Sequence, residues 1–214
     1  TPLIARWPAH IPAGARCESL VSTIDVAPTL LNLAGVEPGP TFQGKDLAPL
    51  FRDPKAKVND LIFAERNWHD YAARGRAARS ERFKYIKNDD HDHNLNPPAD
   101  AVRSPTFVDM RKLRDEAKLP PEQSTVFVSP RPAEELYDLD ADPHEFKNLA
   151  ADPNHAETLA DMRRALAEWQ RQTNDAAPEN PTPDKFDRES GTPLPNHARP
   201  RPSKEAATAK SVSE

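Results

Sequence analysis

Proline is the feature that most limits what this chain can fold into. The sequence holds 24 prolines among 214 residues, roughly twice the usual share of about 5%. Proline lacks a backbone N–H and has a fixed φ, so it interrupts helix interiors and central strands. Apolar residues make up only 36% of the chain, and the mean hydropathy is −0.81. We therefore expect a folded core accompanied by segments that are extended or disordered.

Charge and cysteine content exclude several classes of protein. The formal charge is −5 and no block of Lys and Arg stands out, which argues against nucleic-acid binding. No apolar run approaches the roughly 18 residues that a membrane span needs. The single cysteine, Cys17, rules out an internal disulfide and a multi-cysteine zinc site within these residues. The chain also opens at Thr1 without a secretory segment, so we expect it to be a piece of a longer protein.

The first 52 residues carry most of the dense apolar segments and read as α/β. Apolar runs predict strands at 3–7, before Pro8, and at 20–24. A helix over 26–34 is expected, with Asp25 as its N-cap and Gly35 as its stop. The polar, charged stretch 53–60 marks the predicted domain boundary.

Residues 53–173 predict a small α+β subdomain with an antiparallel sheet and a packing C-terminal helix. Residues 174–214 contain seven prolines and few large apolar side chains, so we expect a disordered tail. The elements expected in the subdomain are strands at 61–65, 76–80, 83–87 and 136–139, a helix over 106–118, and a final amphipathic helix starting at Asp152-Pro153.

Several polar groups are candidate sites, each with a structural alternative. Residues 67–70 (Asn-Trp-His-Asp) directly follow a buried-type strand, where side chains line a pocket or cover a sheet edge. The run 89–93 (Asp-Asp-His-Asp-His) offers metal-ligand types, although such runs usually face water. Cys17 has no evident base nearby. Four arginines can bind an anion or form a charged strand face. These arginines are Arg74, Arg76, Arg79 and Arg82.

Five segments occur in the order and at the spacing of one enzyme family. Residues 1–8 (TPLIARWP) and 20–31 (LVSTIDVAPTLL) resemble the late catalytic-domain segment of the sulfatases. Residues 43–47 (QGKDL) resemble the step that follows it, and 79–86 (RSERFKYI) a family strand. Residues 135–150 resemble the closing motif, whose pattern is ELYDL-x-x-DP-x-E-x-x-NLA. The resemblance covers about residues 1–172 and identifies the chain as the C-terminal portion of a sulfatase.

A narrower likeness points to the heparan N-sulfatase (sulfamidase) branch. It is carried by residues 93–96 (HNLN), 104–107 (SPTF) and 167–170 (AEWQ). The first two lie in an insertion that many arylsulfatases would not share.

The resemblance implies an alkaline-phosphatase-like α/β fold and hydrolysis of sulfate esters or of the sulfamate N–S bond. The family uses a formylglycine nucleophile, made from the Cys or Ser of a C/S-x-P-S-R motif, and a calcium ion held by Asp and Asn side chains. Cys17 is followed by Glu18-Ser19-Leu20, so it does not match that motif. We therefore expect no catalytic residue and no metal ligand in this chain, both lying upstream, and no activity from the 214 residues alone.

The resemblance also implies that the C-terminal subdomain closes over the mouth of the active site. His69 is then the leading substrate contact, supported by Asn67, Trp68, Asp70 and Arg74. The expected partner is a sulfated glycan or a sulfated small molecule, which implies a periplasmic or secreted parent protein.

Two other functions stay open on the sequence. One is a phosphodiesterase or phosphonate hydrolase of the same superfamily. The other is a non-catalytic glycan-binding module, which the lack of a nucleophile motif would favour.

Overall fold

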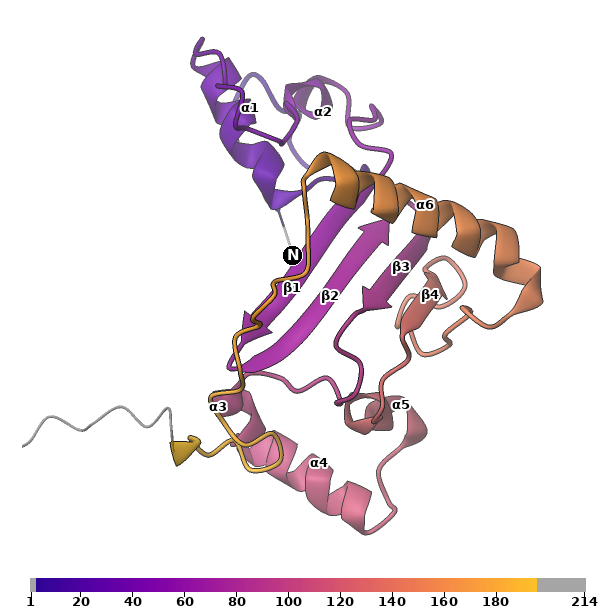
Figure 1. Ribbon diagram of the computed structural model, residues 1–214. Coiled ribbons are helices and arrows are strands. Elements are labelled where there is room, and N and C mark those ends of the chain that lie inside the picture. Colours follow the sequence, from indigo (N-terminus) through magenta and orange to yellow (C-terminus); the bar gives the residue numbers. More distant parts are fainter. Residues whose placement is uncertain (1–2, 196–214) are drawn as a thin grey trace, which may run out of the picture. The chain divides into compact units, whose positions relative to one another are not determined.

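The computed structural model describes residues 3–195, and alternation of apolar and polar side chains accounts for the sheet at its centre. Four strands lie in the order β1-β2-β3-β4, and β2–β3 and β3–β4 are antiparallel pairs (Figure 1). Ala78 opposes Tyr85, which in turn opposes Leu136, so one face of the sheet is apolar. The strands are β1 (Ile62–His69), β2 (Tyr71–Arg79), β3 (Phe83–Asn88) and β4 (Glu134–Asp138).

The long helix α6 (Ala156–Gln172) runs across this sheet (Figure 1). Its buried residues Leu159, Met162 and Leu166 recur at helical spacing and pack on the apolar sheet face. Near its end, Trp169 stacks on Phe63 of β1 with ring centroids 5.1 Å apart. The predicted antiparallel sheet with a packing C-terminal helix is confirmed.

The remaining helices are short, as the proline content predicts. Among the described residues, no helix is both long enough and apolar enough to cross a membrane. The helices are η1 (Thr23–Asp25), α1 (Val26–Leu33), α2 (Ala48–Arg52), α3 (Ala99–Val102), α4 (Pro105–Asp115), α5 (Pro121–Ser124), η2 (Thr125–Phe127) and η3 (Pro153–His155).

The chain divides into two compact units that differ from the predicted domains. The boundary predicted at 53–60 falls inside the first unit, where Asn59 donates to the carbonyl oxygen of Leu20. Within the described residues, the first unit comprises 3–66, 74–89 and 132–176, and the second comprises 67–73, 90–131 and 177–195.

Two predicted strands in the first unit do not form. Residues 3–7 are irregular, Leu20 makes a single bridge to Asn59, and Thr23–Asp25 is a 3₁₀ turn. An apolar run becomes a strand only where another strand accepts its backbone hydrogen bonds. None of the described residues pairs with 3–7 in this way, and the Ile4 side chain is 91% exposed.

Asp25 stands at the N-cap position of α1, but its side chain makes no cap hydrogen bond there and holds the loops of the first unit together instead. It is only 2% exposed, and its carboxylate accepts from the backbone N–H of Ser22 (2.8 Å) and of Lys45 (2.8 Å). Asn59 Nδ2 donates to the same carboxylate at 3.0 Å. Gly44 permits this arrangement, because a Cβ there would lie 2.1 Å from the carbonyl oxygen of Ile24.

The second unit has its own small core, formed by Tyr71, Ala99, Val102 and Phe107. Phe186 packs against this core and forms a bridge with Pro193. The prediction of disorder over 174–214 is therefore wrong for 174–195, because composition does not reveal these tertiary contacts. Residues 196–214 lie outside the described residues.

Replacing Asp25 tests how much of the first unit depends on it. Asp25→Ala leaves three donors without their acceptor, so we expect a loss of about 3 kcal/mol in the free energy of unfolding. Urea unfolding followed by tryptophan fluorescence measures the change. The exposed Asp60→Ala is the matched control, expected to stay within about 0.5 kcal/mol. Equal effects of the two substitutions would contradict this account.

Candidate functional site

Four of the five residues predicted to contact substrate, 67–70, lie at the end of the β1–β2 hairpin, and the fifth, Arg74, lies within β2. The sequence predicted a strand ending at residue 65 with 67–70 following it, but residues 67–69 belong to β1 and only Asp70 separates the two strands. The correction has a simple cause, because pairing with β2 extends β1 beyond its apolar part. The His69 side chain is 64% exposed, and its Nδ1 lies 3.5 Å from Asp70 Oδ2. Its imidazole is therefore available to a ligand.

Asp70 and Trp68 have structural partners in the second unit. Asp70 has a positive φ of 64°, and its Oδ2 accepts from the backbone N–H of Ala99 at 2.9 Å, at the start of α3. Trp68 Nε1 donates to the carbonyl oxygen of Pro183 at 3.0 Å, and Lys185 Nζ lies 4.8 Å from the indole centroid. Asn67 is exposed on β1. The role of these residues as substrate contacts stays a prediction.

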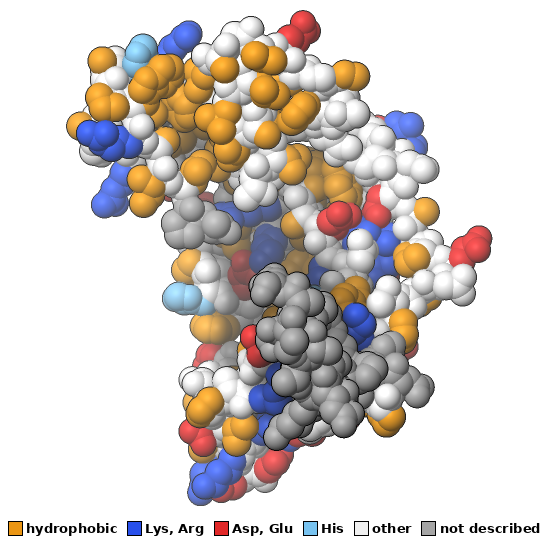
Figure 2. Space-filling view, turned by 90° about the vertical axis from the view of Figure 1, so that its left-hand side faces the viewer, with side chains coloured by type: hydrophobic (Ala, Val, Ile, Leu, Met, Phe, Trp, Pro, Cys, Tyr) orange, Lys and Arg blue, Asp and Glu red, His pale blue; other side chains and the backbone are white. Residues whose placement is uncertain are grey.

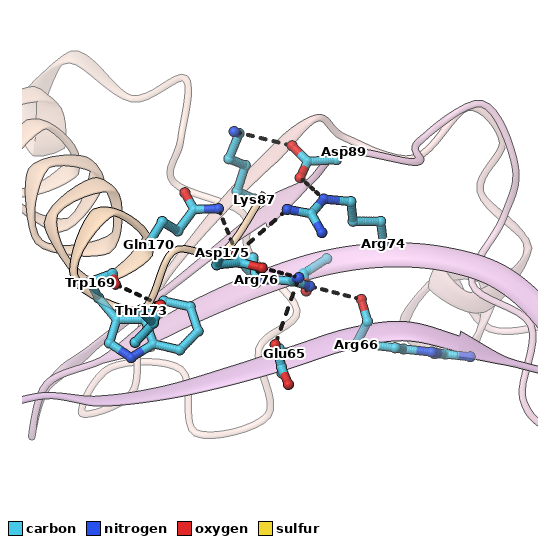
Figure 3. A network of polar contacts seen from close by, with 11 residues as sticks. Glu65, Arg66, Arg74, Arg76, Lys87, Asp89, Trp169, Gln170, Thr173 and Asp175 are labelled. Carbon is cyan, nitrogen blue, oxygen red and sulfur yellow. Dashed lines mark hydrogen bonds and ion pairs between the residues drawn. The ribbon is translucent and has the colours of Figure 1, made fainter. Parts of the chain in front are cut away.

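Arg74 lies in the first unit, within a polar network (Figure 3). Its Nε forms an ion pair with Asp89 at 2.9 Å, and Nη2 lies 3.5 Å from Asp175. Lys87 joins from β3, with Nζ 3.1 Å from Asp89. Because the Arg74 side chain is only 13% exposed and already faces two carboxylates, a substrate anion would compete with them.

Arg76 is the centre of this network and is buried to 1% exposure. It makes a two-pronged contact with Asp175, Nε to Oδ2 at 2.7 Å and Nη2 to Oδ1 at 2.6 Å (Figure 3). Nη1 donates to the carbonyl oxygens of Arg66 (3.1 Å) and Gly75 (2.8 Å). The anion that Arg76 binds is thus a carboxylate of the chain itself.

Asp175 was not identified from the sequence, although it lies three residues beyond α6. Hydrogen bonds from Arg76 are the main cause that lowers the pKa of its carboxyl well below the usual range, and Gln170 adds to the effect. Gln170 Nε2 donates to Oδ2 at 3.0 Å. Asp175 therefore stays ionised and fastens the end of α6 to β2. Arg76 lies on a strand at a position whose side chain is buried. Because a buried charge needs a partner of opposite charge, this position was the signal that an acidic partner exists.

The acidic and histidine run 89–93 does not assemble a metal site. Asp89 is paired with Arg74 and Lys87, and within residues 3–195 no group of three or more His, Cys, Asp or Glu side chains could hold a metal ion.

Cys17 is an exposed free thiol. It lines a groove of about 370 Å³ in the first unit, with mainly apolar neighbours such as Leu3, Ile11, Val21 and Phe51. Figure 2 shows apolar side chains gathered over the part of this unit that Figure 1 places at α1 and α2. The exposed large apolar residues here are Leu3, Ile4, Trp7, Ile24, Leu30, Leu33, Val36 and Phe42.

Breaking the Arg76–Asp175 pair tests its structural role. Arg76→Met leaves Asp175 without its principal partner, so we expect a loss of about 3–5 kcal/mol in the free energy of unfolding. The exposed Arg79→Met on the same strand is the control, expected within about 0.5 kcal/mol. Chemical unfolding of both variants measures the two losses in the free energy of unfolding. A loss below 1 kcal/mol for Arg76→Met would show that the pair is dispensable.

The same pair predicts a dependence of stability on pH. Because the pKa of Asp175 is lower in the folded than in the unfolded chain, its ionised form stabilises the fold above the unfolded pKa of about 3.9. This stabilisation is lost progressively as the pH falls below that value. We expect Asp175→Asn to be less stable at neutral pH and to lose less stability on acidification. Unfolding free energies between about pH 6 and 2 measure both slopes, and parallel slopes would contradict the assignment.

This chain is similar in sequence to a family model and to several known proteins. Residues 1–96 match the family model described as N-sulphoglucosamine sulphohydrolase, C-terminal. The chain is 35% identical over 171 residues to an ulvan-active sulfatase of Formosa agariphila, covering 79% of this chain and 28% of that relative. It is 29% identical over 189 residues to human N-sulphoglucosamine sulphohydrolase, covering 81% of this chain and 37% of the relative.

A solved structure shares the fold. It is a protein in complex with its substrate D-glucosamine-2-N,6-O-disulfate, with a TM-score of 0.56 at 22% identity, and it covers 81% of this chain and 28% of that one. This chain thus spans between 28% and 37% of the length of these relatives.

Together, the fold and the ordered motifs place this chain among the C-terminal portions of proteins that share this fold. Within that class, the chain belongs to the sulfatase family, of which it matches the C-terminal portion.

Proposed function

We propose that this chain is the C-terminal portion of an enzyme that hydrolyses sulfate groups of a sulfated glycan, as O-sulfate esters or N-sulfate. The observation that carries the proposal is the 35% identity to an ulvan-active sulfatase over 79% of the chain. The family match over residues 1–96 supports N-sulfate as one candidate bond. Residues 104–107 and 167–170, which also suggested that branch, lie outside the matched range.

The chemistry of the reaction would come from residues other than these 214. Cys17 is followed by Glu18-Ser19-Leu20, which does not fit the nucleophile motif, and among the described residues no three His, Cys, Asp or Glu side chains are grouped to hold a metal ion. We therefore propose that the formylglycine and the calcium ion of the family belong to another part of the enzyme, and that this chain alone is inactive.

The exposed apolar surface of the first unit also supports the proposal that the catalytic groups belong to another part of the enzyme. Eight large apolar side chains between Leu3 and Phe42 are exposed in the first unit, and residues 3–7 have no partner strand among the described residues. Such a surface is larger than scattered single residues would give. We propose that the remainder of the catalytic domain covers it.

The contribution of this chain to substrate binding is proposed to come from the end of the β1–β2 hairpin. His69 offers an exposed imidazole that can donate a hydrogen bond to a sugar hydroxyl or a sulfate oxygen. Because sulfated glycans lie outside the cytoplasm, we propose a periplasmic or secreted enzyme.

The gene product that carries these residues tests the proposal directly. We expect it to release sulfate from D-glucosamine-2-N,6-O-disulfate, measured by ion chromatography, and the 214-residue chain alone to release none. Release of phosphate from p-nitrophenyl phosphate without release of sulfate would favour a phosphoester hydrolase instead. Binding of the disulfate without turnover by the gene product would favour a non-catalytic module.

His69→Ala in the gene product tests the substrate contact. Loss of one hydrogen bond to a charged group is expected to raise KM about tenfold. His144→Ala is the matched control, because His144 is also exposed and stacks only on Phe146 at a ring distance of 5.6 Å. An unchanged KM in His69→Ala would remove His69 from the site.

A further inference from the structure

Residues 183–188 run alongside the end of the β1–β2 hairpin and bond to alternate residues of it. Trp68 Nε1 donates to the carbonyl oxygen of Pro183 at 3.0 Å. The backbone N–H of Lys185 donates to the carbonyl oxygen of Asp70 at 2.8 Å. The backbone N–H of Ala72 donates to Asp184 Oδ1 at 2.7 Å. The segment thus contacts the hairpin at three successive alternate positions.

At Ala72, Asp184 and Arg188 together make the backbone hydrogen bonds that a neighbouring strand would otherwise make. The β2–β3 register ends at Gly75, so the polar groups of Ala72 lie beyond it. Asp184 accepts from the N–H of Ala72, and Arg188 Nη2 donates to the carbonyl oxygen of Ala72 at 2.7 Å. The two side chains are also paired with each other, Arg188 Nε to Asp184 Oδ2 at 2.6 Å. Both backbone groups of Ala72 are therefore satisfied by one ion pair.

Arg188 also covers the aromatic ring at the centre of this arrangement. Its guanidinium carbon lies 5.4 Å from the centroid of Tyr71, which has no exposed surface. The hydroxyl of Tyr71 donates to the carbonyl oxygen of Asp187 at 3.4 Å. Burial is the main cause that raises the pKa of Tyr71 above its ordinary value, and the charge of Asp70 adds to it. Tyr71 therefore stays a neutral donor to the segment.

The segment is itself anchored in the second unit. The N–H of Asp187 donates to the carbonyl oxygen of Thr192 at 2.8 Å, and that of Leu194 to Lys185 at 2.9 Å, which closes residues 185–194 into a loop. Arg103 donates to the carbonyl oxygen of Gly191 and lies 5.7 Å from the ring of Phe186. Gly191 is required, because its φ is 68° and a Cβ would lie 2.8 Å from the carbonyl oxygen of Ala99.

Asp70 is the hairpin residue that needs such support. A non-glycine residue at positive φ carries a conformational cost, which its surroundings must offset. Two contacts do so, the carboxylate with the N–H of Ala99 and the carbonyl with the N–H of Lys185. The backbone angle at Asp70 sets the course of the chain immediately after His69.

We propose that residues 183–188 form a clamp that fixes the β1–β2 turn, with Asp184 and Arg188 as positioning residues for the substrate contact of His69. The role of His69 rests on the proposed function, whereas the effect of the clamp on the turn does not. None of residues 183–188 lies in the range matched by the family model, so the clamp is a feature of this chain beyond that match.

Asp184→Ala in the gene product tests the clamp with two readouts. We expect the amide hydrogen of Ala72 to exchange about tenfold faster, because it loses its acceptor. We expect KM for D-glucosamine-2-N,6-O-disulfate to rise about fivefold with kcat changed less than twofold, because only substrate placement is affected. Asp184→Asn keeps an oxygen acceptor and is expected to restore most of the protection of Ala72.

Glu179→Ala is the matched control, an exposed acidic residue that precedes the clamp in the chain, and is expected to change neither readout. Equal exchange at Ala72 in Asp184→Ala and Glu179→Ala would overturn the clamp. Faster exchange with an unchanged KM would overturn the positioning role. If Asp184→Ala does not fold, Arg188→Gln removes the ion-pair partner that holds Asp184 at the N–H of Ala72, and the same two readouts then apply. If the unaltered gene product releases no sulfate, the proposed function fails, and the exchange at Ala72 alone decides the clamp.

Discussion

The buried pair of Arg76 and Asp175 is the interaction on which the first unit depends most. A guanidinium cannot give up its charge, so at 1% exposure it requires a carboxylate and further acceptors around it. Asp175 provides the carboxylate, and the carbonyl oxygens of Arg66 and Gly75 accept from the remaining donors. This requirement holds the chain beyond α6 against β2, and with it the helix that covers the apolar face of the sheet.

Buried and half-buried polar groups recur as organising centres in a chain with few apolar residues. Asp25 collects two backbone N–H groups and Asn59 in the first unit, and Asp184 with Arg188 satisfies Ala72 in the second. Each centre ties together segments that carry little apolar surface of their own. An apolar share of 36% limits what burial alone can stabilise, so hydrogen bonds to ionised groups carry more of the fold.

Elements with a regular pattern were predicted well. The strands at 83–87 and 136–139 and the helix containing Leu159 and Met162 formed close to where their periodicity placed them, whereas the strand predicted at 76–80 begins earlier, at Tyr71. The strands at 3–7 and 20–24 did not form, because a strand depends on a partner that its own sequence does not encode. Residues 177–195 were missed for the converse reason, since polar and proline-rich residues can be held by contacts with distant backbone groups.

For the candidate site too, the sequence indicated some features and only the tertiary structure showed the others. Residue types and family motifs alone indicated the sulfatase family and directed attention to residues 67–70, because motif identity and local periodicity are properties of neighbouring residues. Only the tertiary structure showed that His69 is exposed while Trp68 and Asp70 are engaged by Pro183, Lys185 and Ala99. It also showed Arg74 and Arg76 occupied by carboxylates of the chain. These assignments depend on contacts between residues about 100 positions apart, such as Arg76 with Asp175, which no local pattern in the sequence specifies.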